Sequence, residues 1–182
     1  MRNIITLAGD LGSGKGTVSN ILADELNYTI YRNGEYFRSL AKEKGMSVSE
    51  FCSYVSEHPE IDRSIEESAR EYAKNHDNLI IDARLGWYVV PDSFKVYLRV
   101  DIDEAAKRAF NDPNRKETES FDTVLEQKND MIKRQKLENN RYKVLYNIDN
   151  LDMNNYDLVV DTTNMTPDEV AKVILDNYQN NL

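Results

Sequence analysis

The residues best suited to chemistry form a glycine-rich segment near the start of the chain, Gly9-Asp10-Leu11-Gly12-Ser13-Gly14-Lys15-Gly16-Thr17. An apolar, strand-like run precedes the segment, and a helical pattern of apolar residues follows it. Glycines let successive backbone N–H groups turn toward one anion, and a helix start adds free donors and a positive dipole end. Lys15 can bring its charge to the β- and γ-phosphates of a nucleotide. The segment therefore predicts a triphosphate-binding loop, with a ligand-free flexible loop as the alternative.

The hydroxyl residue of this loop lies one position later than in the usual pattern, G-x-x-x-x-G-K-[ST]. Gly16 follows Lys15, and the hydroxyl belongs to Thr17. Such a hydroxyl is a ligand of the Mg²⁺ ion that accompanies the triphosphate, so we expect Thr17 to bind metal.

Two charged residues, Asp82 and Arg84, lie at the end of the apolar run Leu79-Ile80-Ile81. In open parallel sheets, ligands bind beyond the carboxyl ends of the strands. Asp82 is placed to hold waters of a Mg²⁺ ion, and a helix or turn cap is the alternative. The guanidinium fork of Arg84 suits a second phosphate, and a surface salt bridge is the alternative.

Further arginines could complete a phosphate site. Gly34 permits a tight turn, and Arg38 falls in the first turn of the next helix, although a solvated arginine is the alternative. Arg134, Glu138 and Arg141 share one face of a long helix because of their i, i+4, i+7 spacing. The two arginines could grip a transferring phosphoryl group, with Glu138 fixing their orientation. An exposed ladder of ion pairs fits the spacing equally well.

A polar segment over residues 111–120 is flanked by Arg108 and contains Arg115. Its composition, which includes Pro113, indicates a short mobile loop. A closing loop that brings arginine onto ATP would exclude water and stabilise developing charge. Arg108 is therefore predicted to bind ATP, against the alternative of an ordinary exposed arginine.

The elements that must position these residues form a regular series. Helical patterns alternate with five strand-like runs, at residues 3–8, 28–31, 78–83, 94–100 and 156–161. The alternation predicts a parallel sheet with crossover helices. Capping boxes mark two helix starts, Ser47 with Glu50 and Thr166 with Glu169, and Asp103 is a further candidate N-cap.

Two segments interrupt the alternation. Residues 34–75 hold two or three short helices, which is more than one crossover needs. The polar loop 111–120 is the second interruption, and a long helix follows it from about Phe121 to Tyr146. At 182 residues, the chain is expected to form one α/β domain over residues 1–182.

Composition limits the classes of partner. The net charge of −9 argues against nucleic acid or an anionic membrane as the main partner. Cys52 is the single cysteine, so a reducing compartment is expected, and we interpret it as a packing residue. Without an 18-residue apolar run or an apolar leader, the chain is expected to be cytoplasmic. A monomer is expected, with the oligomeric state left open.

Several motifs in order resemble those of nucleoside monophosphate kinases: G-x-x-G-x-G-K-G-T, Gly34-x-x-x-Arg38, Asp82-x-Arg84 and the arginines of the long helix. Within that group the chain resembles cytidylate kinases, especially the short archaeal-type branch, over essentially its whole length. The segments that carry the resemblance are Glu35–Ala41, His58–Arg63, Ala83–Trp87, Arg141-Tyr142 and Tyr156–Thr162.

The resemblance implies a three-layer α/β/α P-loop NTPase fold with a five-stranded parallel sheet, a helical monophosphate-binding insertion at 34–75 and a short lid at 111–120. It implies phosphoryl transfer from ATP to CMP or dCMP with Mg²⁺ as cofactor. Residues 9–17 would bind ATP, with Lys15 and the loop amides on its phosphates, and Thr17 and Asp82 would bind the metal. The acceptor and transferring phosphates would be held by Gly34, Arg38, Arg84, Arg134, Glu138 and Arg141. No general base is needed, because the acceptor is already an anion.

Some positions depart from the relatives' patterns. Bacterial cytidylate kinases place Asp where this chain has Leu85, and Asp where it has Glu138; the archaeal-type branch usually has Glu-Gly-Arg-Leu where this chain has Asp-Ala-Arg-Leu. These changes leave base selection open. Asp62 is a candidate for contacting the cytosine amino group, and a helix cap or an ion pair is equally consistent with its position.

Two other functions remain open at this stage. One is a P-loop kinase for another nucleotide or a small metabolite, since this kind of fold accepts many substrates. The other is a nucleotide-binding regulatory protein without turnover. Retention of Lys15, Asp82 and the arginine set argues against the second.

Overall fold

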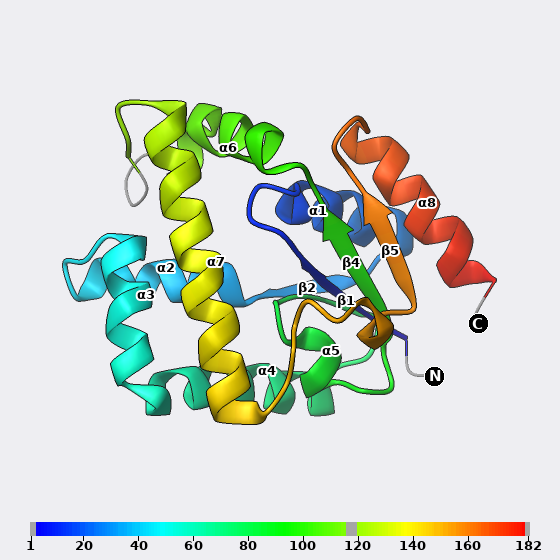
Figure 1. Cartoon of the computed structure of the whole chain (residues 1–182). Helices are drawn as coiled ribbons and strands as arrows, with labels where there is room; N and C mark the ends of the chain where they lie inside the picture. Colours follow the sequence, from blue (N-terminus) through cyan, green and yellow to red (C-terminus); the bar gives the residue numbers. More distant parts are fainter. Residues whose placement is uncertain (1–2, 116–119, 181–182) are drawn as a thin grey trace.

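The computed structural model describes residues 3–115 and 120–180. Within them, five strands form one parallel sheet in the order β2-β3-β1-β4-β5 (Figure 1). The strands are β1 (Ile4–Gly9), β2 (Thr29–Arg32), β3 (Leu79–Asp82), β4 (Phe94–Arg99) and β5 (Leu158–Asp161). The predicted strands and their parallel arrangement are confirmed.

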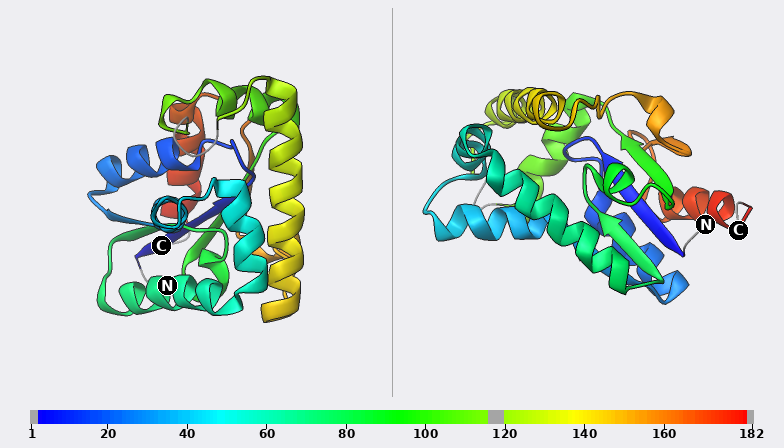
Figure 2. Two further views of the ribbon diagram at one scale, coloured as in Figure 1. Left: turned by 90° about the vertical axis from the view of Figure 1, so that its left-hand side faces the viewer. Right: turned by 90° about the horizontal axis from the view of Figure 1, so that it is seen from below.

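Helices cover both faces of the sheet. They are α1 (Lys15–Leu26), α2 (Asn33–Glu43), α3 (Val48–Glu57), α4 (Pro59–Asn75), α5 (Gly86–Val89), α6 (Ile102–Asn111), α7 (Val124–Tyr146) and α8 (Pro167–Gln179), with 3₁₀ turns η1 (Pro113–Arg115) and η2 (Met153–Asn155). Helices α1 and α8 pack on one face, and α4, α5 and part of α7 pack on the other. Views at right angles show α7 running along one side of the molecule beside α3 (Figure 2). These layers confirm the α/β/α class.

The central strand β1 explains why the sheet has a core on each side. All six of its residues are buried, as expected for a parallel strand covered by helices on both faces. Ile5 and Leu7 face the α1–α8 core, and Ile4 faces the α4–α5 core. This double burial holds the carboxyl end of β1, and with it the glycine-rich loop, in a fixed position.

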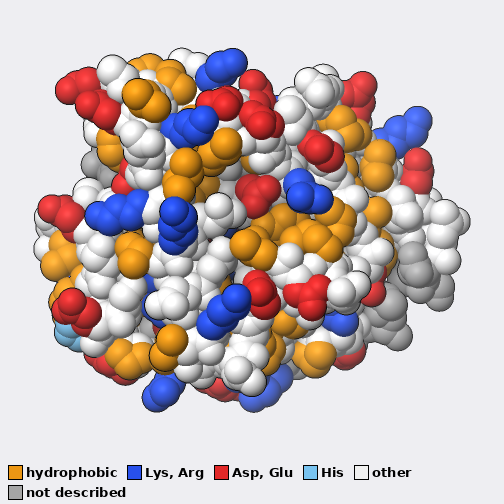
Figure 3. All heavy atoms as spheres, in the orientation of Figure 1, with side chains coloured by type: hydrophobic (Ala, Val, Ile, Leu, Met, Phe, Trp, Pro, Cys, Tyr) orange, Lys and Arg blue, Asp and Glu red, His pale blue; other side chains and the backbone are white. Residues whose placement is uncertain are grey.

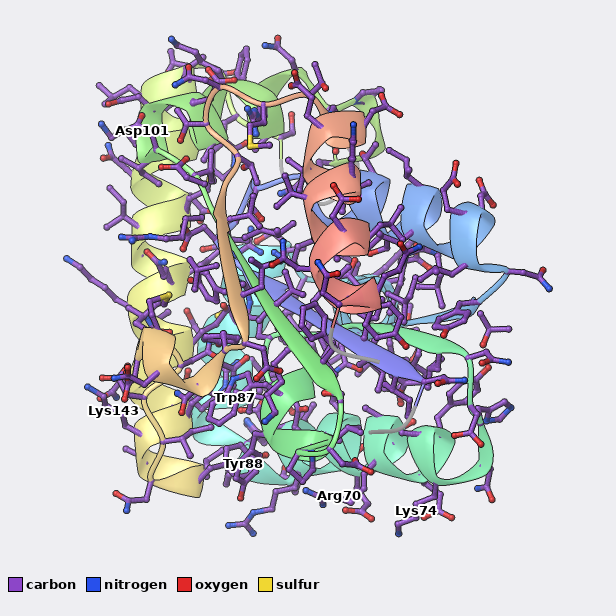
Figure 4. The ribbon with its side chains drawn as sticks, turned by 90° about the vertical axis from the view of Figure 1, so that its right-hand side faces the viewer. Arg70, Lys74, Trp87, Tyr88, Asp101 and Lys143 are labelled. Atoms are coloured by element: carbon purple, nitrogen blue, oxygen red, sulfur yellow. The ribbon has the colours of Figure 1, made fainter. Side chains whose placement is uncertain are left out.

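Helix caps follow the sequence signals with two differences. The boxes at Ser47 and Thr166 form as predicted, and a third at Thr123 starts the long helix at Val124 rather than at Phe121. The α6 cap is Asp101, not Asp103, because the Asp101 carboxylate accepts from the N–H groups of residues 103 and 104. Asp101 lies where β4 passes into α6 (Figure 4).

The long insertion between β2 and β3 contains α2, α3 and α4, as predicted in number. Helix α4 is not short, however: it has 17 residues, and its buried Ala69 and Ala73 pack against Ile4 and Leu79 of the sheet. It therefore serves as the crossover helix as well as a wall of the insertion. Of the predicted lid, residues 116–119 lie outside the described residues, and the rest includes η1.

The surface and the helices agree with the composition. On the face shown in Figure 3, acidic and basic side chains are interspersed. No helix in the described part of the chain is both long enough and apolar enough to cross a membrane. Cys52 is completely buried in α3, in agreement with a packing role.

Candidate active site

The glycine-rich loop joins the carboxyl end of β1 to the first residue of α1, which is Lys15. Gly12 and Gly14 both have positive φ, at 77° and 86°. A Cβ at Gly12 would also lie 2.6 Å from the carbonyl oxygen of Ala105, so no side chain fits there. The two glycines therefore let the loop turn tightly just ahead of the helix start, as a phosphate-binding loop requires.

Two cavities meet at this loop. The larger, of about 650 Å³, is walled by the loop, α2, α4, the end of β3 and α7. The smaller, of about 330 Å³, lies between the loop, the end of α6 and the start of α8. The two cavities share lining residues, among them Gly12, Ser13, Gly14, Thr17 and Arg115. An extended ligand bound across the loop could thus reach from one cavity into the other.

Lys15 points back onto its own loop. Its Nζ donates hydrogen bonds to the carbonyl oxygens of Gly9, at 3.0 Å, and Asp10, at 2.9 Å. The pKa of Lys15 is lowered to about 8, chiefly by burial and next by the charge of Arg84, while the charge of Asp82 opposes the shift. A phosphate in the cavity would supply the negative charge that keeps this ammonium protonated.

Asp82 ends β3 in the wall of the larger cavity. Ser19 of α1 donates to its carboxylate at 3.4 Å, and burial raises the pKa of Asp82 while Lys15 opposes the shift. The described residues contain no group of three or more potential metal-ligating side chains. Mg²⁺ held by one or two protein oxygens, phosphates and waters does not require such a group, so Asp82 with the Thr17 hydroxyl fits that mode.

Arg84 and Glu138 form an ion pair across the larger cavity, with Nε 2.6 Å from Oε2. Arg84 also donates from Nη1 to the Gly9 carbonyl at 3.1 Å. Burial lowers the pKa of Arg84, Glu138 raises it, and the net change is upward. The prediction that Glu138 orients the arginines of its own helix is therefore incomplete, because it holds an arginine that follows β3.

Arg141 forms a buried ion pair with Asp62 of α4 and donates to the Cys52 sulfur at 3.7 Å. Arg134 is also buried, with Nη1 3.7 Å from Asp130. The alternative of an exposed ion-pair ladder on α7 is thus wrong, since these arginines and Glu138 are 5–7% exposed and line the cavity. For Asp62, the ion pair is present, and contact with a base stays a prediction.

Arg38 and Gly34 lie together at the other wall. The Arg38 guanidinium nitrogens are 3.6 and 3.8 Å from the point where a Gly34 side chain would begin. Both residues line the larger cavity with the loop and the α7 arginines. The structure thus brings the predicted acceptor-site residues of three separate elements to one cavity.

Arg108 lines the smaller cavity instead. Its Nη2 donates to the carbonyls of Thr162 and Thr163, at 2.9 and 3.0 Å, and its Nε pairs with Glu104 at 2.9 Å. The guanidinium plane is therefore fixed beside Ala109, Met165, Pro167 and Val170, which are apolar walls of that cavity. Arg108 belongs to α6, and its side chain is 30% exposed, so its contact with ATP stays a prediction.

A family model described as the cytidylate kinase-like family matches residues 4–164. The chain belongs to the cytidylate kinase-like family. The family and the fold together identify a P-loop kinase with nucleotide substrates.

Similar proteins align with most of the length of this chain. A cytidylate kinase of Methanobrevibacter smithii is 35% identical over 94% of this chain and 96% of its own length. One from Thermoplasma volcanium is 37% identical over 94% of this chain and 88% of its own. An S-adenosylmethionine-dependent nucleotide dehydratase of Lacinutrix mariniflava is 34% identical over 98% of this chain, but the chain spans only 36% of that longer protein.

Solved structures support the fold of this kinase. Shikimate kinase from Bacteroides thetaiotaomicron has a TM-score of 0.66 and 14% identity, with 98% of this chain and 99% of that chain covered. Shikimate kinase from Aquifex aeolicus has a TM-score of 0.57 and 20% identity, with 98% and 97% covered. At these identities, the likeness establishes the shared fold alone.

Asp10 and Leu11 of the kinase's loop do not present their side chains to a phosphate. The Asp10 carboxylate accepts from Tyr97 Oη at 2.8 Å, Val100 N at 3.1 Å and Gln135 Nε2 at 3.2 Å. Leu11 is buried in the cluster between α6 and α7. Gly9 and Asp10 lie outside the lining of both cavities, and their carbonyl oxygens accept hydrogen bonds from Lys15; Leu11 also borders the larger cavity. These residues anchor the loop from behind.

Sequence reasoning missed Glu66, a buried carboxyl of α4 in the wall of the larger cavity. It also missed Ser19, which positions Asp82. The signal for Glu66 was its spacing: it lies four residues after Asp62, so both face the same side of the helix.

The buried Asp62–Arg141 pair should be important for stability. Asp62→Ala leaves the Arg141 guanidinium buried without its partner, and we expect the free energy of unfolding to fall by about 3–5 kcal/mol. Urea unfolding at pH 7 would measure this. Glu67→Ala, which removes an exposed partner of Arg70, is the control and should cost less than about 1 kcal/mol. Equal effects of the two substitutions would contradict a stabilising role for the buried pair.

Proposed function

We propose that this kinase transfers the γ-phosphoryl group of ATP to CMP or dCMP, with Mg²⁺ as cofactor. The observation that carries the proposal is the pair of cavities that meet at the phosphate loop, with a cluster of cations in the larger one. That cavity is lined by Lys15, Arg32, Arg38, Arg84, Arg115, Arg134 and Arg141. Six carboxyl groups of the described residues line it as well: Glu35, Asp62, Glu66, Asp82, Asp112 and Glu138. In a chain of net charge −9, these seven cations around one cavity nevertheless suit a site that holds several phosphates together.

The ATP side is assigned from the loop and the smaller cavity. The loop N–H groups and Lys15 would hold the β- and γ-phosphates, and the adenine would enter the cavity that Arg108 flanks. Its apolar walls and the fixed guanidinium plane suit a flat aromatic ring. Asp82 and Thr17 would hold Mg²⁺, which, when bound, would neutralise charge between the phosphates.

The acceptor side is assigned from the arginines. Arg38, Arg84, Arg134 and Arg141 line one cavity, and together they would hold the acceptor phosphate and the transferring group. An acceptor phosphate is already a nucleophilic anion, so the chain needs to align it and offset charge rather than remove a proton. The ion pairs to Glu138 and Asp62 would keep two of the guanidinium groups oriented before substrate binds.

A kinase for another nucleotide or small metabolite and a non-catalytic nucleotide-binding protein remain the alternatives. The cytidylate kinases among the relatives support the proposed acceptor, and the dehydratase relative matches over only part of its length. A cytoplasmic location and a monomeric state belong to the same proposal.

A coupled assay of ADP release over CMP, dCMP, UMP, AMP, GMP and shikimate tests the acceptor. We expect CMP or dCMP to have the highest kcat/KM, by about tenfold or more over the purine nucleotides, a ratio that differential binding of one base can provide. A reaction without acceptor gives the background ATP hydrolysis. Preference for AMP or GMP would contradict the preference for cytidylate but not the nucleotide kinase assignment, and turnover of none of the acceptors would contradict the proposed function.

A further inference from the structure

A single buried carboxyl in the acceptor cavity is not accounted for by the phosphate chemistry. Glu66 of α4 is 6% exposed and lines the larger cavity. Its Oε2 atom has no hydrogen-bond partner among the described residues. A buried polar atom without a partner is costly, and such atoms are rare in folded proteins. A ligand that hydrogen-bonds to this oxygen would remove that cost.

The surroundings of Glu66 suit a flat ring. Phe37, Val48 and Ile65 contribute apolar side chains to the same cavity, and Ile65 adjoins Glu66 in the chain. Ligand sites generally combine apolar walls with a few polar groups that fix orientation. Asp62 lies one helical turn earlier, but its carboxylate is already paired with Arg141. Of the two α4 carboxyls that line the cavity, Glu66 is therefore the one with a buried oxygen that lacks a partner among the described residues.

We propose that Glu66 recognises the base of the acceptor nucleotide by hydrogen-bonding to the N3–N4 edge of cytosine. The proposal rests on the proposed function, since it names the residue that selects the base in that acceptor site. It replaces the expectation that Asp62 reads the base, and gives Asp62 the role of partner to Arg141.

The protonation state of Glu66 decides which base edge it can match. The pKa of Glu66 is raised to about 8, chiefly by burial and next by the charge of Asp62. Arg141 of α7 and Arg70 of α4 oppose the shift, and Tyr31 of β2 and Tyr146 of α7 also face the carboxyl. At pH 7 the neutral acid predominates, and it offers one O–H donor and one acceptor oxygen.

A neutral carboxyl complements cytosine in both hydrogen bonds. The acid O–H donates to cytosine N3, and the other carboxyl oxygen accepts from the N4 amino group. Ionised Glu66 offers only acceptors, so it would set an oxygen against the N3 lone pair. Recognition of cytosine by Glu66 should therefore be present below pH about 8, and it should be lost as the pH rises through the pKa of Glu66.

The test compares wild type with Glu66→Gln and Glu66→Leu at saturating ATP. Glutamine keeps one donor and one acceptor but has no proton to lose, so its kcat/KM for CMP should stay within about threefold of wild type at pH 7. Above pH 8, wild-type kcat/KM for CMP should fall by up to about tenfold per pH unit, whereas the glutamine variant should stay level. Leucine should raise KM for CMP by about tenfold or more, with a smaller change in kcat.

Two controls isolate Glu66. Lys15 has a pKa of about 8 in the free protein, but saturating ATP and the comparison with Glu66→Gln remove its contribution from the difference. Glu71→Gln changes an exposed carboxylate of the same helix that pairs with Lys74, and should reproduce the wild-type profile. If Glu66→Leu does not fold, as judged by its thermal midpoint, the pH profile of the glutamine variant still decides.

The outcomes separate this inference from the proposed function. If wild type phosphorylates CMP and Glu66→Gln keeps the alkaline decline, the role of Glu66 is overturned and the kinase assignment stands. If no monophosphate is turned over, the proposed function fails. In that case calorimetric titration of CMP decides on Glu66: binding that leucine weakens about tenfold supports the role, and absent or unchanged binding overturns it.

Discussion

Lys15→Met should lower kcat by about a hundred- to a thousandfold, the range found when one preorganised group that stabilises developing charge is removed. Methionine keeps an unbranched stem and loses the ammonium group, so the change removes charge with little loss of packing. Lys15 is the cation at the start of α1, where the two cavities meet. We therefore expect the loss to appear in kcat as well as in KM for ATP.

The fold should tolerate this change. The pKa of Lys15 is lowered to about 8 because burial and the nearby Arg84 disfavour its charge, so the ammonium is a cost to the ligand-free protein. The thermal midpoint of Lys15→Met without nucleotide should match or exceed that of wild type. Stabilisation by added ATP should be smaller than in wild type, because the ligand contact is lost.

The pH dependence gives an independent measurement of the same group. The phosphate contact needs the charged form, and the folded pKa lies below the ordinary value of 10.5. At subsaturating ATP, kcat/KM for ATP should therefore fall as the pH rises above about 8. Lys74→Met, an exposed substitution on the outer side of α4 (Figure 4), is the control and should keep wild-type kinetics. Near-normal kcat in Lys15→Met would contradict a catalytic role.

The features that the sequence predicts well are those set by local rules. The phosphate loop needs a strand, glycines at positive φ and a helix start, and all of these lie within residues 4–26. Runs of apolar residues mark buried parallel strands directly, because such strands are covered on both faces. Asp82 and Arg84 then reach the site because the carboxyl ends of β1 and β3 lie side by side.

The sequence does not predict the ion pairs that form between distant elements. Helical spacing shows that Arg134, Glu138 and Arg141 share a face, but it does not show what lies opposite that face. The fold places the end of β3 against Glu138 and α4 against Arg141, so each pairs with a residue at least 54 positions away. Helical spacing places Glu66 on the same side of α4 as Asp62, but it does not show that Asp62 pairs with Arg141, which is what leaves Glu66 as the proposed contact for the base.

Arg84→Ala should lower kcat/KM by about a thousandfold, comparable with the loss of an arginine that stabilises the transferring phosphoryl group. Arg84→Lys should recover only part of the activity, because an ammonium lacks the planar fork that binds two oxygens. Arg70→Ala, which removes an arginine from the outer side of α4 (Figure 4), should leave activity unchanged.

The ion pair with Glu138 makes the single substitution ambiguous, since removing Arg84 leaves a 7%-exposed carboxylate without its partner. A drop in activity could then come from a weakened fold. The double variant Arg84→Ala/Glu138→Gln separates the two effects, because it removes the uncompensated charge together with the arginine.

We expect the double variant to be more stable than Arg84→Ala, by about 1–3 kcal/mol in urea unfolding, because it contains no orphaned carboxylate. Its kcat/KM should nevertheless remain as low as that of Arg84→Ala, because the missing guanidinium is what the phosphoryl group needs. Glu138→Gln alone should reduce kcat/KM by about tenfold, since Arg84 stays in place but is held less firmly. If activity instead returned along with stability in the double variant, Arg84 would be a structural partner of Glu138, and phosphoryl transfer would rest on the arginines of α7.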